Sequence, residues 1–349
     1  MKKSEGKKVE EVREYGKKSQ PKIRYSQFDA EDIRKELLER YGMEMPVECR
    51  LFDYGMNDIY RIKTKKETYF LRISLAGLHT KKDYEEEMHI LNILIQNGIK
   101  AAAPVKMRGM PGRQEDYVWE LHAPEGIRYA MLFTEAPNSP SDDKESSACN
   151  LGSMLAGIHN ISDREKFQVS RPPIDMCQLV EKPLSNIRPF LADREQDFSF
   201  LKESAEKLAG YIKGKLPETA PVYGFCHGDV HSGNVFFAGD KPTLFDFDCM
   251  GYGWRAYDIC VYAWNETFLD ENYIEGSVWK KYLEGYESVR PLSAEEKETI
   301  PAFAALRQLW LMGLHADVMD RNAGCCWYQD DYFDSQIKMF RLWLDRCSL

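Results

Sequence analysis

No stretch of this sequence is long and apolar enough to form a transmembrane helix. Such a helix needs roughly 18 consecutive apolar residues, and no run approaches that length. The N-terminus is rich in Lys and Glu and lacks the apolar region of a secretory signal. The nine cysteines include no C-x-x-C pair, and the one close pair, Cys325 and Cys326, is adjacent rather than spaced for a metal. We therefore predict a cytoplasmic protein with reduced thiols and no membrane partner.

Basic residues are also scarce once the N-terminus is set aside. The chain carries 47 Lys and Arg against 56 Asp and Glu, which gives a net charge of −9. Nine of these basic residues and four of the acidic ones lie in residues 1–24, so the rest of the chain has 38 basic and 52 acidic residues. Because phosphate backbones attract positive charge, we predict that nucleic acid is not a partner. The acidic body mildly favours a cationic small substrate.

A chain of 349 residues is too long to fold around one small hydrophobic core, and its length suits two lobes that share a cleft. Residues 1–24 lack apolar periodicity, so we expect a flexible basic tail there. We expect residues 25–135 to form a first lobe and residues 136–349 a second, with the polar, proline-containing break at 135–143 as the connection. The sequence makes no prediction about the oligomeric state.

The two lobes differ in their hydrophobic periodicity. Short alternating runs from Val47 to Ser74, with turns near 54–58 and 64–67, predict an antiparallel sheet. We expect a further strand near 101–105 and a hairpin near 110–113. Helical periodicity predicts helices at residues 26–41, 81–96, 144–160, 196–215, 257–268, 277–288, 301–322 and 332–346. In the first of these helices, Ile33, Leu37 and Leu38 are expected to share the buried face.

One charged residue interrupts an apolar strand in the first lobe. Arg72 lies within the run Thr68–Ser74, and a charge so placed needs a partner. The helix expected at 81–96 carries an acidic run, Glu85 to Glu87, most of which we expect to face solvent. One member of that run is expected to turn inward to Arg72.

Residues 225–237 place proton- and metal-handling side chains between short apolar runs. Asp229 and Asn234 lie five residues apart, and Asp246 follows Asp229 by 17 residues across a probable hairpin at Gly239 and Asp240. A hairpin brings the end of one strand beside the start of the next, so Asn234 and Asp246 can converge on one ion. Their oxygen atoms suit Mg²⁺. Asp229 then stands at the mouth of the loop, where it can accept a proton from an attacking hydroxyl.

This spacing resembles that of kinase catalytic loops. The segments His227–Asn234, Phe245–Asp248, Gly251–Gly253 and Tyr257–Ile259 together resemble the aminoglycoside phosphotransferase/choline kinase superfamily. The resemblance extends to a glycine turn at 55–60, the stretch 87–91 with Gly98 and Pro104 beyond it, the segment 133–136 and the helix 151–159. It implies a bilobal, protein-kinase-like α+β fold with a small antiparallel-sheet N-lobe and a larger, mainly helical C-lobe.

The resemblance also implies an activity. The expected reaction is transfer of the γ-phosphoryl group of ATP or GTP, with Mg²⁺, to a hydroxyl of a small molecule. Asp229 would be the catalytic base, and Asn234 and Asp246 the Mg²⁺ ligands. The expected nucleotide contacts are Asn57 in the glycine turn, Arg72 on the phosphates, Glu87 orienting Arg72, and Thr134 and Ala136 holding adenine through their main chain. Many family members have Lys in place of Arg72, so the phosphate pose can differ here.

Other polar residues of the central stretch have supporting roles in this interpretation. His227 is expected to orient the backbone, and Asp258 to tie the catalytic loop down from a helix start. For His231 and Asp248 the sequence leaves two readings open, contact with substrate or support of residues that contact it. His159, at the end of a predicted helix, is expected to be a buried or capping histidine.

Two other functions remain open from the sequence. His227, Asp229 and His231 resemble a transition-metal triplet, which would suit a zinc-dependent hydrolase. A kinase-like protein without catalysis, either structural or nucleotide-binding, is the second.

The acceptor of the expected transfer is a small molecule, because no activation segment separates Asp246 from Tyr257. An amine-bearing alcohol such as an aminoglycoside, homoserine or choline is plausible, with solvated helix faces as the plainer explanation of the acidic residues. The acidic residues expected to wall its pocket are Glu266, Asp270, Glu271, Asp317, Asp320, Asp330, Asp331 and Asp334.

Overall fold

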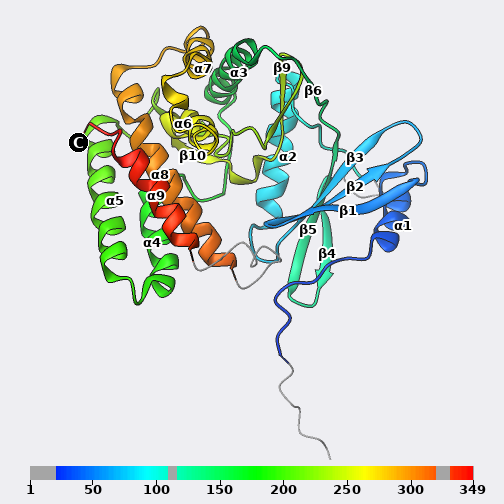
Figure 1. Ribbon diagram of the computed structural model, residues 1–349. Coiled ribbons are helices and arrows are strands. Elements are labelled where there is room, and N and C mark those ends of the chain that lie inside the picture. The colour runs from blue at the N-terminus through cyan, green and yellow to red at the C-terminus, as the bar shows by residue number, and fades with distance from the viewer. Residues whose placement is uncertain (1–20, 109–115, 320–330, 349) are drawn as a thin grey trace, which may run out of the picture.

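A computed structural model describes residues 21–108, 116–319 and 331–348, which form two lobes (Figure 1). The smaller lobe is built on a five-stranded antiparallel sheet with strand order β1-β2-β3-β5-β4. Its elements are α1 (Ala30–Tyr41), β1 (Glu48–Tyr54), β2 (Asn57–Lys63), β3 (Thr68–Ser74), α2 (Lys81–Gln96), β4 (Trp119–Ala123) and β5 (Gly126–Thr134). The predicted antiparallel sheet is therefore confirmed.

The two helices of this lobe begin at capping residues. The Asp29 side chain accepts hydrogen bonds from the first backbone N–H groups of α1, and Gly42 ends that helix with φ of 59°. Thr80 and Asp83 form a capping box that starts α2. The prediction that Leu38 shares the buried face of α1 is wrong, because its side chain is 39% exposed.

Two predictions between α2 and β4 have different outcomes. The strand expected at 101–105 is reduced to two isolated bridges, from Ala101 to Leu244 and from Pro104 to Phe133. The hairpin expected near 110–113 lies outside the described residues, as does nearly all of the predicted basic tail.

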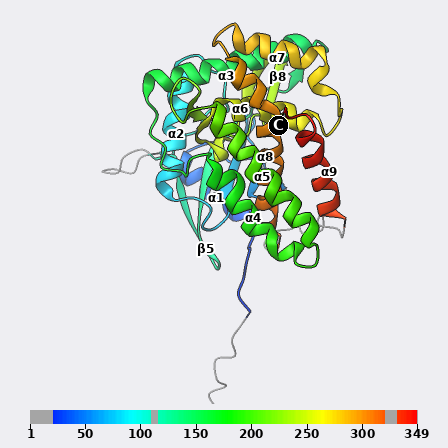
Figure 2. The same cartoon turned by 90° about the vertical axis from the view of Figure 1, so that its left-hand side faces the viewer.

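The larger lobe is mainly helical. Its helices are α3 (Lys144–Glu165), η1 (Cys177–Glu181), α4 (Lys182–Ile187), η2 (Arg188–Leu191), α5 (Glu195–Lys215), η3 (Phe247–Cys249), α6 (Arg255–Glu266), η4 (Tyr273–Glu275), α7 (Ser277–Glu287), α8 (Ala294–Val318) and α9 (Tyr332–Leu344). Its strands are β6 (Ser139–Pro140), β7 (Tyr223–Cys226), β8 (Val235–Gly239), β9 (Lys241–Leu244) and β10 (Gly251–Trp254). Figure 2 shows α4, α5, α8 and α9 grouped together in this lobe. The predicted hairpin at Gly239 is present, with β8 and β9 antiparallel.

The start of α8 was predicted seven residues too late. The predicted helix began at Pro301. Ser293 and Glu296 instead form a capping box that starts the helix at Ala294, so Pro301 lies inside it.

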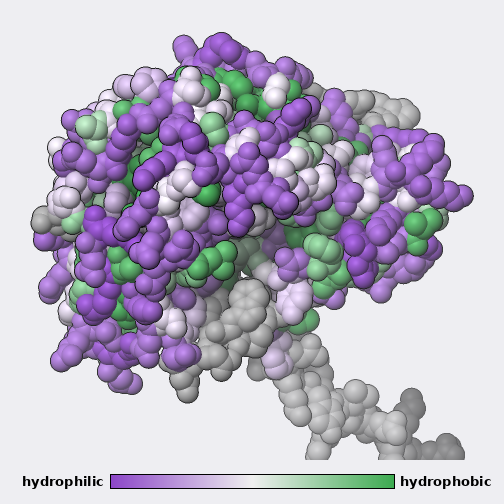
Figure 3. All heavy atoms as spheres, turned by 45° about the horizontal axis from the view of Figure 1, so that its top comes forward, coloured by the Kyte–Doolittle hydropathy of each residue, from purple (hydrophilic) through white to green (hydrophobic). Residues whose placement is uncertain are grey.

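Helix α2 packs mainly with the larger lobe. Its buried side chains, among them Tyr84, Met88 and Leu91, belong to the hydrophobic core of that lobe, whereas α1 and the sheet strands form a separate core. None of the described helices has the length and apolar character needed to cross a membrane. The space-filling view shows the surface hollowed between the lobes (Figure 3).

Candidate functional site

The loop between β7 and β8 carries Asp229 to the wall of a cavity. Gly228 allows the turn: its φ is +83°, and a Cβ there would lie 2.2 Å from the Cys249 carbonyl oxygen. The Asp229 N–H donates to His227 Nδ1 (3.2 Å), and the His227 ring lies against Phe247 with centroids 4.2 Å apart. His227 thus holds the shape of the loop from a buried position.

Both carboxylate oxygens of Asp229 have partners. Arg307 of α8 donates to Oδ1, and Asn234 Nδ2 donates to Oδ2 at 3.0 Å. His231 Nε2 lies 3.5 Å from Oδ2. Burial alone would raise the pKa of Asp229, but the Arg307 guanidinium, His231 and His227 together outweigh it and hold that pKa well below its usual range. Asp229 is therefore an anion with a fixed orientation.

Sequence analysis missed Arg307. It is buried and also donates to the Tyr257 hydroxyl (3.1 Å), and its guanidinium carbon lies 4.8 Å from the Trp264 ring and 4.0 Å from the Trp310 ring. A single arginine in the apolar run 302–312 was the available signal, of the kind that drew attention to Arg72. Nothing local identified Asp229, 78 residues away, as its partner.

Asn234 and Asp246 lie together, as the hairpin argument predicts. Both line one cavity, and Asp246 has a left-handed φ of 61° just after β9. Because Asn234 uses its Nδ2 on the Asp229 carbonyl oxygen and carboxylate, its Oδ1 is the atom left for a cation.

The electrostatics of this pair suit a divalent cation. Burial, only partly offset by Arg72, and the neighbouring carboxylates of Asp248, Asp229 and Glu87 raise the pKa of Asp246 to about 6. A divalent cation would relieve this repulsion, and oxygen donors are the ligands that Mg²⁺ prefers. The residues present therefore fit Mg²⁺, with Asn234 and Asp246 as its holders.

The predicted pairing of Arg72 with Glu87 is present and extends further than predicted. Arg72 Nη2 donates to Glu87 Oε1 at 2.7 Å, and Arg72 Nη1 donates to Asp246 Oδ1 at 3.1 Å. A second arginine, Arg171, donates to the other oxygen of Glu87 at 2.6 Å. Sequence analysis did not single out Arg171, which lies in a proline-containing segment between α3 and η1.

Two cavities open on either side of Asp246. The first, of about 290 Å³, is lined by Arg72, Glu87, Thr134, Ala136, Asn234 and Asp246 together with apolar side chains. The second, of about 600 Å³, lies toward α4 and α8, and among its lining residues are Asn57, Asp229, His231, Asp246, Asp248 and Arg307. Asp246 belongs to both linings, so the two cavities meet at its carboxylate.

The smaller cavity suits a planar aromatic ring, because most of its walls are apolar. Phe52, Ile59, Phe70, Leu91, Phe133, Phe236, Phe245 and Phe247 supply apolar walls. At its edge the Thr134 N–H donates to the Ala103 carbonyl oxygen, and the Thr134 hydroxyl accepts from the Ala103 N–H, both at 2.9 Å. These two bonds fix the backbone of the segment that joins the lobes.

Asn57 bonds to the larger lobe from the start of β2. Its Nδ2 donates to Asp248 Oδ2 at 3.1 Å, and it lines the larger cavity rather than the smaller one. His79, which sequence analysis did not single out, lies 3.6 Å from Asp248 Oδ1 and lines the same cavity. The glycine turn thus approaches the site close to Asp248.

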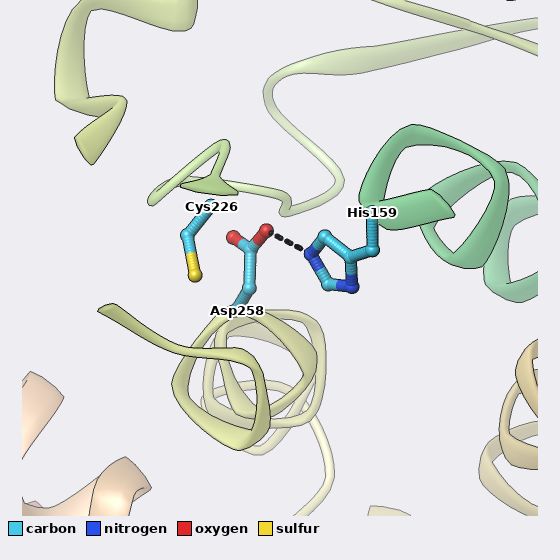
Figure 4. A group of neighbouring side chains, drawn as sticks. All are labelled: His159, Cys226 and Asp258. Atoms are coloured by element: carbon cyan, nitrogen blue, oxygen red, sulfur yellow. Dashed lines mark hydrogen bonds and ion pairs between the residues drawn. The ribbon is translucent and has the colours of Figure 1, made fainter. Parts of the chain in front are cut away.

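Beneath the loop, three buried side chains could be mistaken for a metal site (Figure 4). The ligand atoms of His159, Cys226 and Asp258 lie within 4.8 Å of one another. Asp258, however, accepts the N–H groups of His227 and Gly228 (2.8 Å each) and contacts His159 Nε2 at 2.9 Å. Burial raises the pKa of the Cys226 thiol and keeps it protonated. This group anchors the loop through hydrogen bonds.

The zinc alternative finds no support in the described residues. His227 Nδ1 accepts a backbone N–H, and burial lowers the pKa of His227. His231 Nδ1 likewise accepts the Gly233 N–H (3.0 Å). One ring nitrogen of each histidine is thus engaged in shaping the loop. Among the described residues, His227, Asp229 and His231 do not form a three-ligand group.

The expected acidic wall is largely wrong. Of the eight acidic residues, only Asp317 lines the larger cavity among those described, while Asp320 and Asp330 lie outside the described residues. Asp334 pairs with Arg194 at 2.5 Å, and Glu271 lies 3.5 Å from Lys338. Those two carboxylates form ion pairs at the surface of the larger lobe.

Comparison with known proteins agrees with this geometry. Residues 54–292 match the model of the phosphotransferase enzyme family. The chain belongs to the phosphotransferase enzyme family. The predicted superfamily and fold class are thereby confirmed, and the alternatives are not favoured.

Relatives of this phosphotransferase cover most of its length. An uncharacterised protein of Synechocystis sp. is 32% identical over 301 residues, which is 84% of this chain and 80% of the relative. The homoserine kinase of Agrobacterium fabrum is 38% identical over 279 residues, 78% of this chain and 80% of the relative. Among solved structures, an amicoumacin kinase in complex with AMP-PNP and Ca²⁺ has a TM-score of 0.70 at 22% identity, covering 91% of this chain and 94% of that one.

Proposed function

We propose that this phosphotransferase moves the γ-phosphoryl group of ATP or GTP to a hydroxyl of a small, amine-bearing molecule. The observation that carries the proposal is the meeting of the two cavities at Asp246. A nucleotide in the apolar cavity and an acceptor in the larger one would have their reacting atoms on either side of this carboxylate. Residues 25–135 would bind the nucleotide and residues 136–349 would carry the catalytic loop and the acceptor.

Binding of the nucleotide would use the backbone fixed at the junction of the lobes. The Thr134 carbonyl oxygen and the Ala136 N–H are the groups proposed to hold the base. Arg72 lies at the inner end of the same cavity, where its guanidinium would neutralise phosphate charge. Glu87 orients Arg72 from the buried side.

Chemistry would take place between Asp229 and Asp246. Asn234 Oδ1 and the Asp246 carboxylate would hold Mg²⁺, which supplies neutralisation of charge on the transferred phosphoryl group. Asp229 would orient the acceptor hydroxyl and take its proton as the hydroxyl oxygen bonds to the γ-phosphorus. The bond between the γ-phosphorus and the β–γ bridging oxygen breaks in the same step, and the nucleoside diphosphate leaves. Arg307 and Asn234 fix the Asp229 carboxylate, so most of the catalytic effect is positioning.

The acceptor cavity supports an amino alcohol of moderate size. The described part of its lining combines apolar side chains such as Trp264 and Trp310 with polar and charged ones, and Asp317 is the acidic group away from the catalytic loop and the Asp246–Asp248 segment. The homoserine kinase relative is consistent with such an acceptor, since homoserine carries both an amine and a hydroxyl.

A screen of acceptors tests this proposal. Nucleoside diphosphate release from ATP and from GTP is measured with Mg²⁺ against amino alcohols, homoserine, choline and aminoglycosides. We expect at least one amine-bearing alcohol to raise the rate well above that without acceptor. Turnover confined to acceptors without an amine would contradict the proposed acceptor class, and no acceptor-dependent turnover would contradict the activity.

A further inference from the structure

We propose that Arg171 is a positioning residue that holds α2 and the segment Asp246–Asp248 in the arrangement needed for transfer. The proposal rests on the proposed function, because the residues that it fixes are the ones assigned to the nucleotide and the cation. Arg171 lies 5% exposed in the segment after α3, away from the catalytic loop in sequence.

The contacts of Arg171 reach both lobes at once. One guanidinium nitrogen, Nη2, donates to Glu87 Oε2 of α2 at 2.6 Å. The other, Nη1, donates to the carbonyl oxygens of Phe247 and Asp248, both at 2.8 Å. A planar fork with fixed donors suits this double task, which a lysine ammonium on a flexible stem meets only in part.

Together with the contacts of Arg72, these hydrogen bonds form one closed network, which we call the circuit. Glu87 accepts from Arg72 at one carboxylate oxygen and from Arg171 at the other, and Arg72 donates onward to Asp246. The ring of Tyr84 lies against both guanidinium groups, 5.8 Å from that of Arg72 and 5.6 Å from that of Arg171. Arg171, Glu87, Arg72 and the Asp246–Asp248 segment thus fix one another.

The circuit gives Arg171 a role that Arg72 cannot fill alone. When Arg72 turns toward nucleotide phosphates, its hold on Asp246 weakens. Arg171 does not face the smaller cavity, so it keeps Glu87 and the backbone of Phe247 and Asp248 in place. The cation ligand Asp246 then stays in register with Asn234 while Arg72 is engaged.

The charges of the groups around Arg171 support the same positioning role. Glu87, Asp246 and Asp248 are three acidic groups within reach of Arg72, and Arg171 is the second arginine among them, 3.7 Å from Asp248 Oδ1. Without it, one arginine would face three carboxylates at the place where nucleotide phosphates must also bind. Repulsion would then push the Asp246–Asp248 segment away from α2.

A matched control lies one residue away. The Ser170 N–H and hydroxyl donate to the Glu86 carboxylate at 2.6 and 2.8 Å, which ties the same segment to the same helix at the surface. Ser170→Ala removes a contact between these two elements without touching the circuit. Its comparison with Arg171 variants separates positioning of the site from mere attachment of the segment.

The test compares full-length wild type with Arg171→Met, Arg171→Lys and Ser170→Ala. Partners of residues that hold a metal typically contribute 10- to 100-fold, so we expect Arg171→Met to lower kcat on the order of 100-fold and to raise the Mg²⁺ concentration for half activity about 10-fold. Arg171→Lys should be intermediate, and Ser170→Ala should match wild type.

Calorimetric binding of nucleotide, with and without Mg²⁺, supplies a readout that needs no turnover. Arg171→Met should weaken binding in the presence of Mg²⁺ and leave Mg²⁺-free binding nearly unchanged. This result in a wild type that phosphorylates no acceptor would support the role of Arg171 and reject the proposed function. Wild-type kcat and Mg²⁺ dependence in Arg171→Met, or equal losses in Arg171→Met and Ser170→Ala, would overturn the inference. If Arg171→Met does not fold, Arg171→Lys decides by the same two readouts.

Discussion

Asp229 is held by Arg307 on α8 and by two residues of its own loop, Asn234 and His227, whose ring Nδ1 accepts the Asp229 backbone N–H. Asp229→Asn keeps the shape of the side chain and removes its ability to accept a proton. Loss of a general base typically lowers rates by about 10²- to 10⁴-fold, and we expect a loss of kcat in that range. Nucleotide affinity, measured by calorimetry, should stay within a few-fold of wild type. A variant with the kcat of wild type would remove Asp229 from the assigned role.

Arg307 should matter for stability as well as for rate. Removing one partner of a buried ion pair leaves an uncompensated charge, which typically lowers the free energy of unfolding by about 3–5 kcal/mol. We expect Arg307→Met to show a loss of this order in urea unfolding, together with reduced kcat. Arg194, which pairs with Asp197 and Asp334 at the surface, is the control, and Arg194→Met should lose less than about 1 kcal/mol. Equal losses for the two variants would contradict the assigned importance of burial.

Distance along the chain separates the site residues that sequence analysis found from those that it missed. Asp229, Asn234 and Asp246 follow one another within a single loop and hairpin, so local spacing predicts their convergence. Arg171 and Glu87 are separated by 84 residues, and no local pattern connects them. A buried arginine signals the need for a partner, but only the packing of distant elements decides which carboxylate supplies it.

Helices α3 and α7 approach closely because of two glycines. A Cβ on Gly285 would lie 1.9 Å from the Cys149 carbonyl oxygen, and one on Gly152 would lie 2.0 Å from the Tyr282 carbonyl oxygen. Overpacking of this kind typically costs about 1–3 kcal/mol, so we expect Gly285→Ala to lower the melting temperature. Gly210 lies at an exposed position of α5, where an added Cβ would have no other atom within 4 Å. Gly210→Ala should therefore raise the free energy of unfolding by up to about 1 kcal/mol. Opposite signs from these two variants are the expected result.

His159 links the helices beneath the catalytic loop, and its titration should affect stability. It contacts Asp258 of α6 at Nε2 and the Tyr286 hydroxyl of α7 at Nδ1. Burial lowers the pKa of His159 to about 4, from 6.5 for an exposed histidine. The unfolded chain therefore binds a proton more readily, so stability is lost as the pH falls from about 6.5 to about 4, by up to about 3 kcal/mol for this residue.

Urea unfolding at several pH values measures this effect. His159→Gln should show a shallower loss of stability between pH 6.5 and 4 than wild type, whereas His122→Gln, at an exposed position on β4, should keep the wild-type slope. Parallel curves for wild type and His159→Gln would show that His159 does not titrate as its burial implies.

Element boundaries were predictable where caps and periodicity agree. The predicted helix 81–96 and α2 coincide, since its capping box and apolar stripe point to the same start. The start of α8 was predicted seven residues too late, because the capping box at Ser293, eight residues before Pro301, was not recognised. The isolated bridges at Ala101 and Pro104 show another limit, since strand-like residues there pair with two different parts of the chain.

The two lobes meet through the apolar packing of α2 and through polar contacts at the site. Arg72, Asn57 and Glu87 from the smaller lobe contact Asp246, Asp248 and Arg171 from the larger one. Arrangement of the lobes and assembly of the site are therefore coupled, because these polar contacts also orient residues proposed to act in transfer. Sequence analysis predicted the two lobes from length and pattern, but the second arginine of this interface emerged only from the structure.

Transfer of labelled phosphoryl groups tests the central claim most directly. Wild-type protein is incubated with ATP labelled in the γ-phosphoryl group, Mg²⁺ and the best amino-alcohol acceptor, and the products are separated. The label should appear in a phosphate ester of the acceptor hydroxyl, and omission of Mg²⁺ or the Asp229→Asn substitution should suppress it. A nucleotide-binding wild type that leaves all label in ATP or inorganic phosphate, with every acceptor of the panel, would contradict the account.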